Sequence, residues 1–212
     1  MSSTPMTNSE TQAIRDDLAF LRGLVERSDD FLKFLGRAYF AGGVCYLGQT
    51  LLGLGQSLGW IATTNGPLNL AIGIGPTAIF VVAMVIIVPR GRRKAAPTGQ
   101  VDRAIGAFFG AIGLSNFVLI AVIGSVAFRE KSLVIWLIYP CAVFTFQGAA
   151  WLTMFALRRR AWIGLVAATW FACALGMGLG IGSFTAFAAF ASLGLFFGMT
   201  LPGAWLMTRK SL

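Results

Sequence analysis

Amide and hydroxyl side chains are the chemically active groups nearest the middle of the long apolar runs in this 212-residue chain. An unpaired amide is costly in hydrocarbon, so we expect these side chains to turn away from lipid and to meet one another. Two of them are glutamines seven residues apart, a spacing that places both on one face of a helix. The six candidate residues are Gln49, Gln56, Ser115, Asn116, Thr145 and Gln147.

Two interpretations of these six residues stay open. In the first, which we favour, they form hydrogen bonds between helices, and such bonds contribute about 0.6 kcal/mol each on average in membrane proteins. In the second, they line a small uncharged polar pocket for a lipid headgroup fragment, a quinone or a neutral solute.

Catalytic and metal-binding chemistry lacks its usual residues in this chain. There is no histidine, and all 25 charged residues lie outside the apolar runs, whereas proton relays, ion-coupled carriers and voltage sensors need charged groups at membrane depth. The acidic pairs at residues 16–17 and 29–30 are not followed by a third carboxylate, a histidine or a cysteine. We therefore expect no catalytic residue, no metal and no cofactor, and an intramembrane enzyme is the least favoured function.

Six long charge-free runs indicate an integral membrane protein. A helix needs about 20 apolar residues to cross a hydrocarbon core about 30 Å thick, and 57% of this chain is hydrophobic while 12% is charged. The apolar runs are continuous, which favours helices over the alternating strands of a membrane barrel. They cover residues 38–62, 67–88, 104–126, 132–157, 161–181 and 184–207. With mostly short connections, the sequence predicts an all-α bundle of six transmembrane helices in three antiparallel hairpins.

Lysine and arginine are distributed unevenly between the connections. Fifteen lie in the two terminal segments and in the connections at 89–103 and 158–160, and the other two are Arg129 and Lys131. Positive residues gather on the cytoplasmic side, so both termini, including the tail at 208–212, are predicted to be cytoplasmic. The arginines and the lysine of the two basic connections are expected to hold this topology and to contact anionic lipid, not nucleic acid. They are Arg90, Arg92, Arg93, Lys94, Arg158, Arg159 and Arg160.

Residues 1–37 are predicted to form a cytoplasmic helical arm. Apolar residues recur there at steps of four, three and four, which is typical of an amphipathic helix. These residues are Ile14, Leu18, Leu21 and Val25. The polar residues at 28–30 are expected to cap a second helical stretch that leads into the first span. The arm either docks on the basic loops of its own chain, which we favour, or binds a protein partner.

Proline and glycine within the runs predict kinks and close packing. Pro76, Pro140 and Pro202 each remove a backbone hydrogen bond from the helix that contains them. Glycines four residues apart allow the backbones of two helices to approach closely. The pairs are Gly55 with Gly59, Gly106 with Gly110, Gly176 with Gly180, Gly178 with Gly182, and Gly194 with Gly198.

Aromatic residues near the ends of the runs are typical of a belt at the membrane interface. The residues expected in this belt are Trp60, Trp136, Trp162, Trp205 and Tyr39.

Three segments resemble parts of uncharacterised small six-span inner-membrane proteins of proteobacteria. They are DDLAFLRGLVE at 16–26, GAAWLTMFALRRRAW at 148–162 and LPGAWLM at 201–207. The resemblance implies a bacterial inner-membrane location and an N-terminal cytoplasmic helix. It implies no activity and no functional residue.

The sequence favours a non-enzymatic membrane protein that acts through a partner, as an accessory, sensory or regulatory component. The expected partners are membrane lipid and a protein that binds residues 1–37 and the cytoplasmic loops. The alternative is a carrier or channel for a neutral or lipid-like solute, with the midplane amides as its site. The arm favours the first function, whereas the proline-kinked, glycine-rich spans favour the second.

Overall fold

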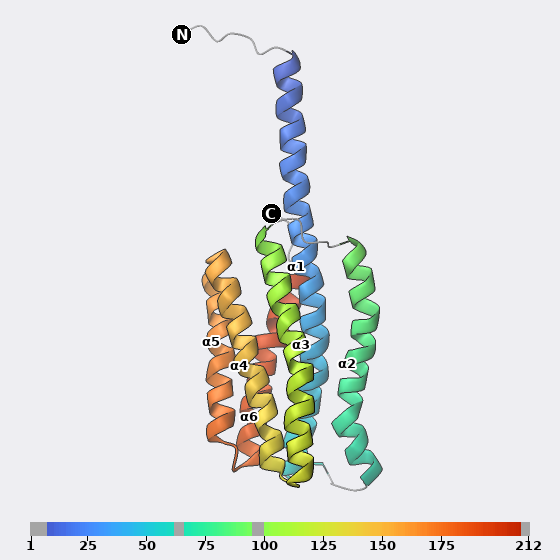
Figure 1. Cartoon of the computed structure of the whole chain (residues 1–212), viewed down its shortest axis with the longest axis vertical. Coiled ribbons are helices and arrows are strands. Elements are labelled where there is room, and N and C mark those ends of the chain that lie inside the picture. Colours follow the sequence, from blue (N-terminus) through green and yellow to red (C-terminus); the bar gives the residue numbers. More distant parts are fainter. Residues whose placement is uncertain (1–7, 62–65, 95–99, 209–212) are drawn as a thin grey trace.

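The computed structural model describes residues 8–61, 66–94 and 100–208, and for 8–29, 68, 70 and 90–94 it describes the backbone alone. The described residues form helices and contain no strand, which confirms the all-α prediction for this part of the chain. The elements are α1 (Asn8–Ser57), α2 (Gly66–Lys94), α3 (Gln100–Arg129), α4 (Leu133–Arg158), α5 (Ala161–Leu179), α6 (Phe184–Gly194), the π-helix η1 (Leu195–Thr200) and α7 (Leu201–Thr208). The helices from α1 to α6 alternate in direction, and α6, η1 and α7 follow one another without a break as a single helical segment (Figure 1).

Five helical segments within the described residues are long and apolar enough to cross a membrane. They are Ala71–Pro89, Gln100–Arg129, Leu133–Arg158, Ala161–Leu179 and Phe184–Thr208. The run expected at 38–62 lies mostly in α1, which is not among the five. This part of α1 contains glycines and polar residues, which lower its mean hydropathy. Such residues are tolerated there because α1 packs against α2, α6, η1 and α7.

The helix α1 is continuous over 50 residues, a length of about 75 Å at 1.5 Å per residue. The cap expected at residues 28–30 is therefore wrong, because the backbone stays helical through them. Phe31, Leu32 and Leu35 are buried immediately afterwards and hold the next turns against the bundle. Figure 1 shows the N-terminal part of α1 projecting beyond the bundle, so the arrangement in the structure is not the docked one that we favoured.

The basic connection that begins at residue 89 is helical in its described parts. The helix α2 continues through Pro89 to Lys94, and α3 begins at Gln100. A proline inside a transmembrane-type helix is tolerated where neighbouring groups satisfy the freed carbonyl. Residues 95–99 lie outside the described part of the chain.

The core lies between α1, α4, α5 and the α6–η1–α7 segment. Its largest fully buried side chains include Trp151 and Met154 of α4, Trp170 and Met177 of α5, and Leu206 of α7. In contrast, α2 packs mainly against α1, and its membrane-length part contains no buried residue. The helix α1 therefore separates a well-packed group of helices from a peripheral helix.

Close backbone contact between α1 and the η1–α7 segment depends on glycines outside the predicted pairs. A Cβ atom added at Gly203 would lie 2.5 Å from the backbone nitrogen of Phe40, and one added at Gly43 would lie 2.8 Å from the backbone of Thr200. Among the predicted pairs, Gly194 and Gly198 do lie against large side chains, whereas Gly178 and Gly182 have open space around them.

The π-helix η1 ends at Thr200, two residues before Pro202. Proline has no backbone N–H, so Pro202 cannot donate a hydrogen bond to the carbonyl of Gly198, four residues earlier. The indole nitrogen of Trp170 donates to this carbonyl at 3.1 Å. Gly198 allows this approach, because an added Cβ would lie 2.8 Å from the Trp170 ring. A side chain of α5 thus satisfies the backbone group that the proline leaves open.

We expect Gly203→Ala to destabilise the bundle by about 1–3 kcal/mol, the usual cost of overpacking. The added methyl group meets the backbone of α1, which cannot move aside as a flexible side chain would. Gly178→Ala is the matched control and should leave the unfolding midpoint unchanged or higher, because Gly178 is helical and has open space around it. Thermal unfolding in detergent measures both, and equal midpoints for the two variants would contradict the close contact.

Candidate functional site

The two glutamines of α1 both bond to α2. The Gln49 amide nitrogen donates to the carbonyl oxygen of Gly73 at 2.6 Å, and the Gln56 amide nitrogen donates to the side-chain oxygen of Asn69 at 3.1 Å. Gly73 lies in the turn before Pro76, where the proline disturbs the backbone hydrogen bonds of the helix. Both glutamines thus share one face of α1 and hold the peripheral helix α2.

Gln147 lies elsewhere, in a buried aromatic group between α1, α3 and α4. Its side-chain oxygen accepts a hydrogen bond from the hydroxyl of Tyr39. The Tyr39 ring packs edge-on against Phe109 and Trp151, with centroids 5.6 and 5.4 Å apart. Tyr39 is 6% exposed, so its expected place in the interfacial belt is wrong. It is a core residue, and its hydroxyl needs the buried acceptor that Gln147 provides.

The other candidates of this group do not join either glutamine site. The Thr145 hydroxyl donates to the carbonyl of Cys141 in its own helix, and Ser115 is exposed on α3. The side-chain oxygen of Asn116 is buried and has no hydrogen-bond partner within the described residues. The six residues are therefore spread over separate places, and their binding of a ligand stays a prediction.

A buried ion pair joins the start of α3 to the end of α4. Asp102 is 4% exposed, and one of its carboxylate oxygens accepts a hydrogen bond from the guanidinium of Arg158. Sequence reasoning missed Asp102, although a lone carboxylate in a strongly basic connection next to an apolar run is a signal that could have found it. Arg158 therefore has a protein partner in addition to the lipid contact that we expected.

The three consecutive arginines have different surroundings. Arg159 adopts a left-handed conformation with φ of 49° and ends α4, while Arg160 precedes α5. Both are exposed, as is Arg103 on α3. These residues together with Asp102 and Arg158 define what we call the arginine-rich end of the bundle. The side chains of Arg90, Arg92, Arg93 and Lys94 lie outside the described part of the structure.

Hydroxyl groups form a second polar contact that sequence reasoning missed, between α1 and α6. The Ser192 hydroxyl bonds to that of Thr50 at 3.1 Å, and the Thr185 hydroxyl bonds to that of Ser57 at 3.2 Å. Both residues of α1 are seven apart, as are both residues of α6. This spacing of seven is the pattern that could have predicted a continuous contact between the two helices.

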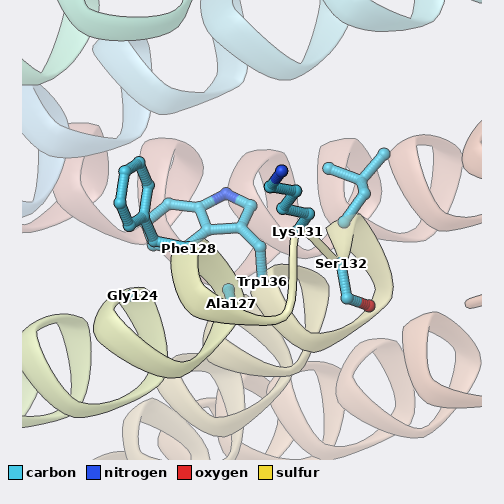
Figure 2. Close-up of a pocket in the computed structure, with 7 residues that line it drawn as sticks. Gly124, Ala127, Phe128, Lys131, Ser132 and Trp136 are labelled. Atoms are coloured by element: carbon cyan, nitrogen blue, oxygen red, sulfur yellow. The ribbon is translucent and has the colours of Figure 1, made fainter.

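A shallow depression lies at the turn between α3 and α4 (Figure 2). It is lined by Gly124, Ala127, Phe128, Lys131, Ser132, Leu133 and Trp136. The lining is mainly apolar, and Phe128 is 86% exposed, so a lipid chain or an aromatic side chain could lie here without any specific polar contact. The depression contains none of the predicted site residues.

No family model, curated protein or solved structure matches the chain. Within the described ranges, no three cysteine, aspartate or glutamate side chains gather as metal ligands would. The class that the fold defines is an all-helical bundle with five helices suited to cross a membrane.

We expect Arg158→Gln to destabilise the bundle by up to about 3 kcal/mol, because the buried carboxylate of Asp102 loses its cationic partner. Arg159→Gln removes an exposed charge from the same turn and should change the unfolding midpoint little. Adding Asp102→Asn to the first variant should restore much of the loss. A double variant as unstable as Arg158→Gln alone would contradict the pairing.

We expect Tyr39→Phe to lower the free energy of unfolding by about 1 kcal/mol, within the range measured for hydrogen bonds between transmembrane helices. The substitution keeps the ring contacts and removes the bond to Gln147. Tyr139→Phe is the matched control, because Tyr139 stacks on Trp136 through its ring. Unfolding in detergent compares the two variants, and equal losses would show that the Tyr39 hydroxyl contributes nothing specific.

Proposed function

We propose that this chain is a non-enzymatic integral membrane protein that acts through a protein partner as an accessory, sensory or regulatory component. The observation that carries the proposal is the continuity of α1 from Asn8 to Ser57. The same continuous helix projects beyond the bundle and contacts α2, α6, η1 and α7 within it (Figure 1). A protein bound to the projecting part would act directly on the helix around which the bundle packs.

In this proposal the chain crosses a bacterial inner membrane six times, in three hairpins, with α1 supplying the first span. The projecting part of α1 and the arginine-rich end face the cytoplasm. The distribution of fifteen basic residues on that side and two on the other supports this orientation. The exposed Arg159 and Arg160 lie where anionic headgroups would meet them.

A carrier for a neutral solute has less support from the geometry. Such a carrier needs polar groups that converge on one cavity near the membrane midplane. Two of the described amides instead bond at separate places, because Gln49 donates to a carbonyl of α2 and Gln147 accepts from Tyr39. The π-helix η1 is the remaining feature in its favour, since π-helical turns are frequent at functional sites.

We expect affinity purification of the tagged chain in mild detergent or nanodiscs to retain one protein near a one-to-one ratio. Deleting residues 1–28 should release that protein, because the projecting part of α1 is removed while the bundle keeps its contacts. Mass spectrometry of retained proteins and lipids is the measurement. Size-exclusion chromatography of the deletion variant is the control for folding. Solute flux in proteoliposomes from the purified chain alone would contradict the proposal and favour the carrier.

A further inference from the structure

We propose that the projecting part of α1 and the arginine-rich end of the bundle together bind a single amphipathic helix of another protein. This proposal rests on the proposed function and deepens it, because it states the chemistry of the partner.

The apolar positions of the projecting part continue in step with buried positions farther along α1. Leu32, Leu35 and Tyr39 come fourteen residues after Leu18, Leu21 and Val25. A repeat of seven drifts by only about 20° per heptad, so both sets follow nearly the same face of one helix. The later set is buried in the bundle of its own chain. Figure 1 shows no other described helix alongside the projecting part of α1. We call the apolar positions of this part the apolar stripe (Ile14, Leu18, Leu21 and Val25).

Charged residues border the apolar stripe in a regular order. With Leu18 and Leu21 at the a and d positions of a heptad, one flank carries Arg15 and Arg22 at e, and the other carries Glu10 and Asp17 at g. Residues at e and g select the partner of a coiled coil and its orientation. A fitting helix therefore presents acidic residues to the first flank and basic residues to the second. The end of this partner helix nearest the bundle is acidic, because it would lie against the exposed Arg103, Arg159 and Arg160.

A second whole copy of this chain does not fit the apolar stripe. Copies in one membrane have the same orientation, so their stripes would pair in parallel, with helix axes about 10 Å apart. On that same face of α1 lies the bundle itself, because Tyr39 packs on Trp151 of α4 and Gly36 lies against Leu206 of α7. The two bundles would occupy the same space. A lone helix avoids this overlap, since it can end above the arginine-rich end.

The membrane surface does not fit either, since α1 continues without a break from Asn8 into the bundle. To lie flat on lipid, the projecting part would have to bend near residue 30 and lose helical hydrogen bonds there. The occupant that matches both the straight helix and its charge pattern is a protein helix.

The test uses a dye-labelled synthetic peptide as the probe, with the sequence of residues 8–26 followed by three glutamates that supply the acidic end nearest the bundle. In a parallel pair this peptide brings Glu10 against Arg15 and Asp17 against Arg22, and it carries no bundle that would clash. Fluorescence anisotropy measures its binding to the full-length protein, one copy per nanodisc of neutral lipid. We expect binding that weakens about tenfold or more when the protein carries Leu18→Gln with Leu21→Gln. A peptide with Arg15→Glu and Arg22→Glu should lose a similar amount.

The matched control is the protein with Ala19→Gln and Gly23→Gln, which changes the same turns away from the apolar stripe and should bind the peptide as the wild type does. Equal binding by the Leu18 and Leu21 variant and this control, or no binding at all, would overturn the proposal. So would a disulfide between two full-length copies in native membranes, with Leu21→Cys as the only cysteine. Protection of residues 8–28 from trypsin by anionic vesicles alone would assign the stripe to lipid instead.

These results are separable from the test of the proposed function. If a protein partner is retained only when residues 1–28 are present, but still binds the variant with Leu18→Gln and Leu21→Gln, the proposed function is supported and the apolar stripe is excluded as its binding surface. If the peptide binds as expected but no protein is retained in the purification, the binding surface is supported and the proposed function is contradicted.

Discussion

Lipid cannot accept or donate hydrogen bonds, and the structure of this protein depends on that constraint. Each polar group at membrane depth needs a partner within the protein. Trp170 donates to the Gly198 carbonyl that Pro202 leaves open, and Gln49 donates to Gly73 in the turn before Pro76. Threonine hydroxyls bond to carbonyls of their own helices, as Thr145 does to Cys141. Four of the side chains that suggest a ligand site in the sequence thus bond to backbone or side-chain groups of the protein: Gln49, Gln56, Thr145 and Gln147.

The same constraint explains the central position of α1. One face of this helix carries Gln49 and Gln56, which bond to α2, and another carries Gly36 and Gly43, which lie against the α7 and η1 segments. Glycine permits close van der Waals contact, and glutamine supplies hydrogen bonds across a helix pair that buries little surface. These two kinds of packing make α1 less apolar than its neighbours, and they suit it to be surrounded by protein. A continuous helix in this position connects the projecting segment mechanically to every helix it contacts.

At the arginine-rich end, one of the three consecutive arginines forms an ion pair within the protein and the other two are exposed. Arg158 pairs with the buried Asp102 and joins α3 to α4, while Arg159 and Arg160 remain exposed in the turn that follows. Three identical residues in a row thus have two kinds of surroundings. The difference arises because the helix α4 ends between them, with Arg159 in a left-handed conformation that turns the chain toward α5.

The sequence by itself determined the helical class and most helix bounds. Continuous apolar runs separated by charged connections allow few other structures. The runs at 132–157 and 184–207 differ from α4 and from the α6–α7 segment by at most one residue at each end. Local composition did not decide the course of residues 28–30 or of 89–94. At 28–30 the helix continues through residues that often begin or end one, and the turns that follow are held by the buried Phe31, Leu32 and Leu35. At 89–94 the helix α2 continues past Pro89 although its membrane-length part contains no buried residue. Only the tertiary structure decided which polar residues meet. Gln147 bonds to Tyr39, 108 residues away in the sequence, and Asp102 bonds to Arg158, 56 residues away. Helix periodicity places a residue on a face, but the partner of that face depends on how the helices rotate and pack against one another.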